Sequence, residues 1–155
     1  MNAAMQTIKL PRNRAEISAL IPHQGDMCLL ESVESCDENG IVCSTTTHRS
    51  LNHPLQRNGS LAAIHLCEYG AQAMAVHGGL MAQADGKIAK PGLLIALRDV
   101  KLSAASVDSS IEILRVVAKR LSANDTAWQY EFSVSGPGAP LASGRAMVMT
   151  KISGL

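Results

Sequence analysis

The chain has 155 residues, a length that suits one domain and is short for two. Apolar residues make up 46% of it, charged residues 17%, and the formal net charge is +1, so a buried core is expected and intrinsic disorder is excluded. The sequence has no stripe of Lys and Arg for nucleic acid and no apolar run long enough for a bilayer span or a signal peptide. We therefore predict a single domain over residues 1–155 in the cytoplasm.

The cysteines lie in apolar runs and form neither a C-x-x-C pair nor a zinc pattern with the histidines. Buried thiols in such runs behave as small hydrophobic side chains, which is typical of a protein from a reducing compartment. We expect neither a metal nor a cofactor. The four residues are Cys28, Cys36, Cys43 and Cys67.

The first part of the chain predicts a short helix followed by a hairpin. The helix is expected over residues 14–20 and ends before Pro22. Strands are expected over residues 27–36 and 41–48, because the turn between them ends in Asn-Gly. A polar loop over residues 49–58 follows and carries His53-Pro54.

One long helix is expected next, over residues 60–77 (SLAAIHLCEYGAQAMAVH), with Ser60 as its N-cap and Gly78-Gly79 as its stop. Four further strands are predicted over residues 92–102, 111–121, 128–135 and 141–152. Strands on both sides of one helix, without regular β-α alternation, indicate an antiparallel α+β fold.

The predicted helix is apolar nearly all round, which is typical of a buried helix, and its small residues would let a sheet approach closely. Glu68 is the only charged residue between Ser60 and Val76. A buried carboxylate must be paired, hydrogen-bonded or protonated. Glu68 is therefore a functional carboxylate, a group that reaches solvent at the helix edge, or a structural partner of His65 or Gln72.

Two motifs lie close to these candidate residues. One combines the His53-Pro54 loop, Gly59 and a helix whose residues 68–79 read EYGAQAMAVHGG. The other is the opening with Pro22-His23 and residues 28–33, CLLESV. Both resemble motifs of the hotdog-fold 3-hydroxyacyl-(acyl carrier protein) dehydratases, whose opening has the pattern P-H and L-L-D-x-V. The helix motif is closest to the branch associated with aryl polyene biosynthesis. The chain departs from the family in residues 55–59, which lack its phenylalanine and its proline-rich turn.

The resemblance implies a hotdog fold and the dehydration of a 3-hydroxyacyl thioester. His53 of one chain would be the base and Glu68 of its neighbour the acid, meeting across a dimer interface. Backbone N–H groups at the helix start, over Gly59, Ser60 and Leu61, would bind the thioester oxygen. The substrate would be a thioester of acyl carrier protein or coenzyme A, bound by a homodimer, a higher oligomer or a pair with a homologous hotdog chain.

Several alternatives stay open. Gln72 could orient Glu68 or make a core hydrogen bond. His23 is the second candidate for the catalytic histidine, although a histidine after proline in a turn is more often structural. His65 is expected to be a satisfied core histidine, and His48 and His77 show no distinguishing feature. On the same fold the chain could instead be an acyl thioesterase or a non-catalytic subunit of a heterodimer.

Overall fold

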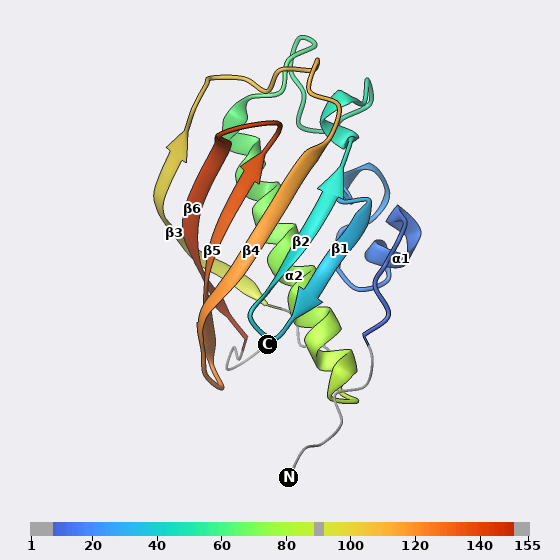
Figure 1. The fold of residues 1–155 in the computed structure, drawn as a ribbon, viewed down its shortest axis with the longest axis vertical. Helices are drawn as coiled ribbons and strands as arrows, with labels where there is room; N and C mark the ends of the chain where they lie inside the picture. The colour runs from blue at the N-terminus through green and yellow to red at the C-terminus, as the bar shows by residue number, and fades with distance from the viewer. Residues whose placement is uncertain (1–7, 89–91, 151–155) are drawn as a thin grey trace.

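A six-stranded antiparallel sheet curves around one long helix in the computed structural model, which describes residues 8–88 and 92–150 (Figure 1). The strand order is β1-β2-β4-β5-β6-β3. This arrangement confirms the predicted α+β hotdog fold. The helices are α1 (Arg14–Ser18) and α2 (Leu66–Ala84), and the strands are β1 (Ser32–Asp37), β2 (Gly40–Thr45), β3 (Leu93–Leu102), β4 (Leu114–Ala123), β5 (Ala127–Ser135) and β6 (Pro140–Met149).

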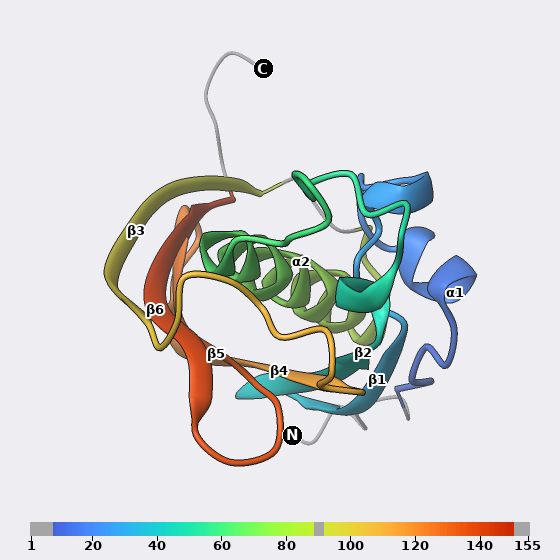
Figure 2. The same cartoon turned by 90° about the horizontal axis from the view of Figure 1, so that it is seen from above.

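Helix α2 lies on the concave side of the sheet, as the view from above shows (Figure 2). The alternation in β4, β5 and β6 places every second side chain against the helix, as expected for a sheet with one covered face. The largest fully buried side chains of this layer include Tyr69 and Leu66 of α2 and Phe132 and Tyr130 of β5. The core therefore forms between α2 and the sheet.

Gly70 lets α2 approach β5 closely. A Cβ atom built at Gly70 would lie 2.5 Å from the Cδ2 atom of Phe132, nearer than side chains can pack. The Cε1 and Cζ atoms of the same ring lie close to Gly144 of β6, where a Cβ atom would be 3.0 Å from each of them. The prediction that small helix residues admit the sheet is confirmed at this position.

Helix α2 begins later than the sequence predicted, so Ser60 is not its N-cap. A 3-10 turn, Ala63–His65, leads into α2 at Leu66. The preceding backbone forms bonds elsewhere: the Ser60 N–H donates to Arg57 O, and the Ala63 N–H donates to Ala105 O. The chain between Gly59 and Ala63 pairs with the segment that enters β4, and these bonds replace a helical turn.

The helix also ends later, because Gly78 and Gly79 lie inside it and Gly86 is the terminal glycine. Gly86 has φ +68, and the N–H groups of Gly86 and Lys87 donate to Gln83 O and Ala82 O. These are the two bonds of a Schellman motif. Gly79 serves packing instead, since a Cβ atom there would lie 3.3 Å from Leu20 O. The predicted stop at residues 78–79 is wrong.

The first strand is shorter than predicted, while the hairpin turn is confirmed. Residues 28–31 lie outside β1 because side chains bind their backbone: Gln72 Oε1 accepts from Leu29 N–H, and Arg14 Nε donates to Cys28 O. Asp37 closes the turn, where its Oδ1 accepts from the N–H groups of Asn39 and Gly40. Strand β2 stops at Thr45, and residues 47–49 form a 3-10 turn instead of continuing the strand.

The remaining strands match the predicted elements with shifted ends. Strand β4 starts at Leu114 and not at residue 111, and β6 ends at Met149, while residue 152 of the predicted last strand lies outside the described residues. Three of the four thiols are buried as predicted, and Cys36 is half-buried. No helix in residues 8–88 and 92–150 is long and apolar enough to cross a bilayer.

Strand β3 forms an open edge of the sheet. Its residues Leu97 and Leu102 pair with Ala146 and Ala142, which are buried in the core, so both leucines lie on the helix-facing side. Nevertheless they are 40% and 39% exposed. Apolar side chains on the inner face of an edge strand are therefore left uncovered by the described part of this chain.

Candidate active site

A histidine and a carboxylate meet at the partly open side of α2. Glu68 lies in the first turn of the helix, and its Oε1 is 3.0 Å from Nε2 of His23. The two side chains are 33% and 29% exposed, but Nδ1 of His23 is buried without a hydrogen-bond partner among the described residues, so a substrate can reach the pair only on the side of Nε2. The loop that carries His23 is held by Gln24, whose amide donates to Ser18 O and Ile21 O. The pair combines a titratable base with a titratable acid inside one chain.

Gln72 holds Glu68 from one helical turn further on. Its Nε2 donates to Glu68 Oε1 at 3.2 Å and to Met27 O at 2.7 Å, while its Oε1 accepts from Leu29 N–H at 2.9 Å. These partners determine the orientation of the amide, because only the oxygen can accept from an N–H group. Gln72 thus orients Glu68 and also forms a core hydrogen bond, so both interpretations of Gln72 describe its contacts.

His53 lies in a different place, inside the molecule. It is 6% exposed, and both ring nitrogens have partners in its own chain. Nδ1 accepts from the Leu55 N–H at 3.1 Å, and Nε2 lies 2.9 Å from the Tyr69 hydroxyl. The proton is therefore assigned to Nε2, which donates to Tyr69. A single chain does not bring His53 and Glu68 together.

Burial lowers the pKa of His53, and the nearby charges of His65, His48 and Arg14 lower it further. Its imidazole is therefore neutral near pH 7. Burial also raises the pKa of Tyr69 to about 12, so that hydroxyl keeps its proton. The Tyr69 hydroxyl lies 2.9 Å from Thr47 Oγ1, which donates to Leu29 O at 2.6 Å. Two neutral side chains and a threonine hydroxyl thus form a hydrogen-bonded series that ends at Leu29.

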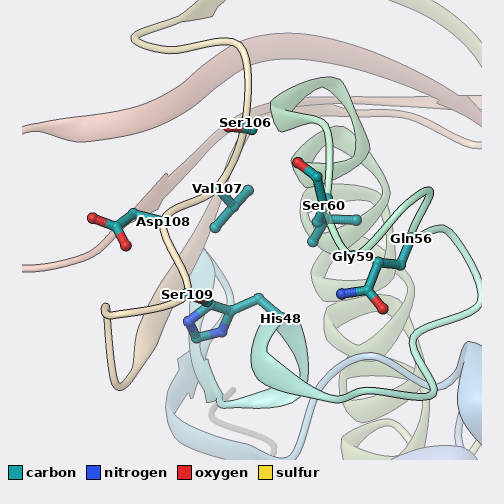
Figure 3. Close-up of a pocket in the computed structure, with 9 residues that line it drawn as sticks. His48, Gln56, Gly59, Ser60, Ser106, Val107, Asp108 and Ser109 are labelled. Carbon is teal, nitrogen blue, oxygen red and sulfur yellow. The ribbon is translucent and has the colours of Figure 1, made fainter.

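A cavity of about 390 Å³ lies beside the start of α2 (Figure 3). The loop before the helix faces the segment before β4 across it, as the labelled side chains show (Figure 3). Three residues expected to bind substrate line this cavity, although Gln72 does not. The lining residues are His48, Gln56, Gly59, Ser60, Leu61, Ser106, Val107, Asp108 and Ser109.

The expected N–H donors at Gly59, Ser60 and Leu61 are not at a helix terminus, which is a correction to the sequence analysis. Gly59 has φ +74 and sits in a turn, and the Ser60 N–H is occupied by Arg57 O. The helix dipole begins at Leu66 instead. These residues line the cavity wall, but their N–H groups are not the free donors of a helix end.

The other histidines differ from the sequence-based expectation. His65 is half-buried and is not a core residue. His77 is the fully buried histidine, with Nδ1 at 2.7 Å from the Tyr130 hydroxyl and Nε2 at 2.7 Å from Asp37 O. His48 binds Ile111 O through Nε2 at 2.6 Å. Burial is the main cause of the lowered pKa of both His48 and His77.

The structure places His23, the second candidate of the sequence, beside Glu68, and it adds contacts of Tyr69 and Thr47 that the sequence did not point to. The signal for His23 was present, because Pro22-His23 belongs to the motif that resembles the dehydratase opening. Tyr69 follows Glu68 directly, so the helix turn points it into the core beside the carboxylate. Nothing in the sequence pairs Thr47 with Tyr69, since that contact depends on how the 3-10 turn after β2 packs on the helix.

The described residues contain no group of three or more His, Cys, Asp or Glu side chains that could hold a metal ion. The His23–Glu68 pair places an imidazole and a carboxyl group within hydrogen-bond distance. It suits the transfer of protons to and from a bound substrate.

Solved structures of dehydratases and thioesterases have a similar fold. A chain of the ApeI:P dehydratase heterocomplex from Xenorhabdus doucetiae matches with a TM-score of 0.79 and 23% identity, covering 88% of this chain and 91% of that one. Thioesterase superfamily member 2 from zebrafish matches with a TM-score of 0.63 and 14% identity, over 89% and 95%. A hypothetical thioesterase with coenzyme A from Streptococcus pneumoniae TIGR4 matches with a TM-score of 0.54 and 13% identity, over 77% and 84%.

These identities are low, so the structural matches establish the fold alone. No curated protein sequence matches the chain. A family model does: the model described as ApeP-like, ApeP dehydratase, matches residues 15–153, which include His23, Glu68 and Gln72. The chain belongs to the ApeP-like dehydratase family.

Proposed function

We propose that the chain dehydrates 3-hydroxyacyl thioesters, carried by acyl carrier protein, to trans-2-enoyl thioesters in a pathway of the fatty-acid or polyene type. The family supports the dehydratase class. The observation that carries the proposal is the 3.0 Å contact between His23 Nε2 and Glu68 Oε1 at a partly exposed position. It supplies the base and the acid that elimination of water requires.

The reaction breaks the C2–H bond and the C3–O bond and forms the C2–C3 double bond. In the neutral form of the pair, with the ring proton on the buried Nδ1, the substrate takes the place of Glu68 at Nε2 of His23, and Nε2 accepts the C2 proton. The Glu68 carboxyl donates a proton to the leaving hydroxyl, which departs as water. The pair then holds an imidazolium and a carboxylate. Transfer of the proton from His23 to Glu68 along their 3.0 Å contact restores the starting form.

The sequence-based proposal, in which His53 of one chain faces Glu68 of its neighbour, needs a second chain and a change at His53. Its two ring nitrogens are bonded to Leu55 N–H and Tyr69 Oη, so His53 would have to leave at least one of these partners to act as a base. His23 also has to release Glu68 from Nε2, but its side chain is 29% exposed whereas His53 is 6% exposed. On this ground we favour His23 as the base and keep His53 in trans as the competing assignment.

A second hotdog chain is part of the proposal. The uncovered leucines of β3 support it, because an edge strand with an apolar inner face can continue the sheet into another chain. The name of the ApeI:P heterocomplex describes such an assembly for a protein of similar fold. We propose a homodimer, a higher oligomer or a pair with a homologous hotdog chain. The four free thiols suit a reducing compartment, and we place the reaction in the cytoplasm.

The thioesterase alternative and the non-catalytic alternative are both tested by one assay. The purified chain, alone and together with a homologous hotdog chain, is incubated with a 3-hydroxyacyl carrier protein and with the corresponding trans-2-enoyl form, and intact masses are followed. Loss or gain of one water with the acyl group still attached supports dehydration. Release of the free carrier means a thioesterase. No change with either substrate, in either preparation, means that the chain is not the catalytic subunit.

A parallel reaction with the matching coenzyme A thioester identifies the carrier. Turnover of the carrier-protein substrate at much lower concentration than the coenzyme A substrate is expected. Equal turnover of both would remove the preference for a carrier protein while leaving the dehydratase assignment intact.

A further inference from the structure

We propose that His53, Tyr69 and Thr47 are positioning residues for the Glu68 carboxyl group, acting through Leu29 and Gln72. The inference rests on the proposed function, in which Glu68 is the acid. It assigns a role to a buried series of hydrogen bonds that none of the catalytic steps uses.

The hydrogen bonds run in one direction from His53 toward Leu29. The Leu55 N–H occupies Nδ1 of His53 and leaves the proton on Nε2, which donates to Tyr69 Oη at 2.9 Å. The Tyr69 hydroxyl can then donate only onward, to Thr47 Oγ1 at 2.9 Å, because Thr47 donates its own proton to Leu29 O at 2.6 Å. We call the series His53–Tyr69–Thr47–Leu29 the donor chain. Aligned donors of this kind strengthen one another in a buried setting.

Leu29 joins the donor chain to the catalytic carboxylate. Its carbonyl is the end of the donor chain, and its N–H donates to Gln72 Oε1 at 2.9 Å. The other end of the Gln72 amide donates to Glu68 Oε1 at 3.2 Å. Leu29 is thus held from both sides, and Thr45 Oγ1 also donates to its carbonyl at 2.6 Å. The Leu29 N–H and Met27 O together hold the Gln72 amide in the orientation that reaches Glu68. The connection is mechanical, because the carbonyl and the N–H of Leu29 belong to different peptide groups.

Burial makes this arrangement specific. Tyr69, Leu29 and Gln72 are 0% exposed, so water cannot replace a lost partner in the interior. A buried hydroxyl or N–H group without a partner is costly, so the loss of one partner favours a shift of its segment toward another. Loss of the Tyr69 hydroxyl therefore alters the position of the Glu68 carboxyl group, although the two groups are not in contact.

The structure offers a matched control at the far end of α2. Tyr130 also bonds a buried histidine, with its hydroxyl 2.7 Å from Nδ1 of His77, but this pair ends at Asp37 O and has no connection to Glu68. Tyr69→Phe and Tyr130→Phe both delete one buried hydroxyl that pairs with a histidine. Both substitutions should lower the stability of the fold by a similar amount. Thermal unfolding of the two variants checks that their structural effects match.

The test compares steady-state kinetics of the two variants in the preparation that is active on the 3-hydroxyacyl carrier protein. Tyr69→Phe should lower kcat by about 10- to 100-fold without changing KM, the size expected for a misplaced catalytic group. Tyr130→Phe should leave kcat unchanged. Thr47→Val should behave like Tyr69→Phe, whereas Thr47→Ser, which keeps the hydroxyl, should restore kcat. Equal kcat in Tyr69→Phe and Tyr130→Phe, or failure of Thr47→Ser to exceed Thr47→Val, would overturn the inference.

A double-variant comparison shows whether the effect passes through Gln72. In a Gln72→Ala background, Tyr69→Phe should cause no further loss of kcat, because the connection to Glu68 is already broken. A full additional loss in that background would contradict the route through Gln72. A Glu68→Gln variant separates the two roles. If it retains wild-type turnover, the assignment of Glu68 as the acid fails, and the positioning role fails with it. If it is inactive while Tyr69→Phe matches Tyr130→Phe, only the positioning role fails.

Discussion

Gln72 and Leu29 lie 43 residues apart in the sequence and share a buried hydrogen bond of 2.9 Å between Oε1 and the backbone N–H. Through this bond the helix that carries Glu68 holds the segment that follows His23. The loop and the helix of the candidate active site are therefore assembled around one amide side chain in the core.

Gln72→Ala should destabilise the protein and reduce its activity together. The substitution leaves Met27 O and Leu29 N–H without their partner, at a cost of about 1–3 kcal/mol for each buried group. Urea unfolding measures this loss. Gln83→Ala on the exposed part of the same helix is the control and should unfold at the wild-type midpoint. A wild-type midpoint for Gln72→Ala as well would show that water replaces the amide.

Substitution of the two candidate histidines separates the assignments of the base. His23→Gln should lower turnover by roughly 10²–10⁴, the contribution of a positioned general base or acid, and Glu68→Gln should do the same. His53→Gln should lower turnover by only about 10- to 100-fold, the loss expected for the positioning residues. If His53→Gln lost as much turnover as Glu68→Gln while His23→Gln stayed active, the base would be His53 acting across a dimer interface.

Gly70→Ala should destabilise the fold by about 1–3 kcal/mol, because its Cβ atom would enter the Phe132 ring at 2.5 Å. Chemical denaturation measures the effect. Gly78→Ala is the matched control on the same helix, since the nearest atom to its Cβ, on Trp128, is 3.7 Å away. The control should be stabilised by about 0.5–1 kcal/mol through helix propensity. Equal effects at both positions would mean that α2 can move away from β5.

Stability should decrease as the pH falls below about 6.5, the ordinary pKa of histidine. Burial lowers the pKa of His77 in the folded state, so the unfolded chain binds more protons under acidic conditions and is favoured there. His48 and His53 act in the same direction. Urea midpoints between pH 8 and pH 5 test this, with His77→Gln as the comparison. A variant whose midpoint falls as steeply as that of the wild type would remove His77 from the effect.

Leu97→Lys should weaken association with a second hotdog chain. The side chain lies on the inner face of β3 and is 40% exposed, so a lysine is tolerated in the single chain and becomes costly when a partner covers it. Light scattering coupled to size exclusion gives the mass. Leu51→Lys, at a residue that is 92% exposed away from β3, is the control and should keep the wild-type mass. A wild-type mass for Leu97→Lys would place the interface elsewhere.

The sequence was sufficient for the fold class, because the apolar helix and the strands around it have clear patterns. It was insufficient for the ends of α2, since Gly79 is used for packing on Leu20 and residues 60–63 bond to the segment before β4. Glu68 was recognisable as the one charge in an apolar helix. The choice between His23 and His53 was not, because it depends on which loop packs beside Glu68 and which histidine Tyr69 binds in the core.

The open edge of β3 also bears on how the protein survives in concentrated solution. Unpaired strand edges with apolar side chains, here Leu94 and Leu97, are starting points for aggregation. If the chain pairs with a homologous hotdog chain, as proposed above, an excess of it over that partner would be lost by self-association, at a rate that grows with its concentration. Balanced production of the two chains would then determine the yield of usable protein as much as the intrinsic stability of either fold.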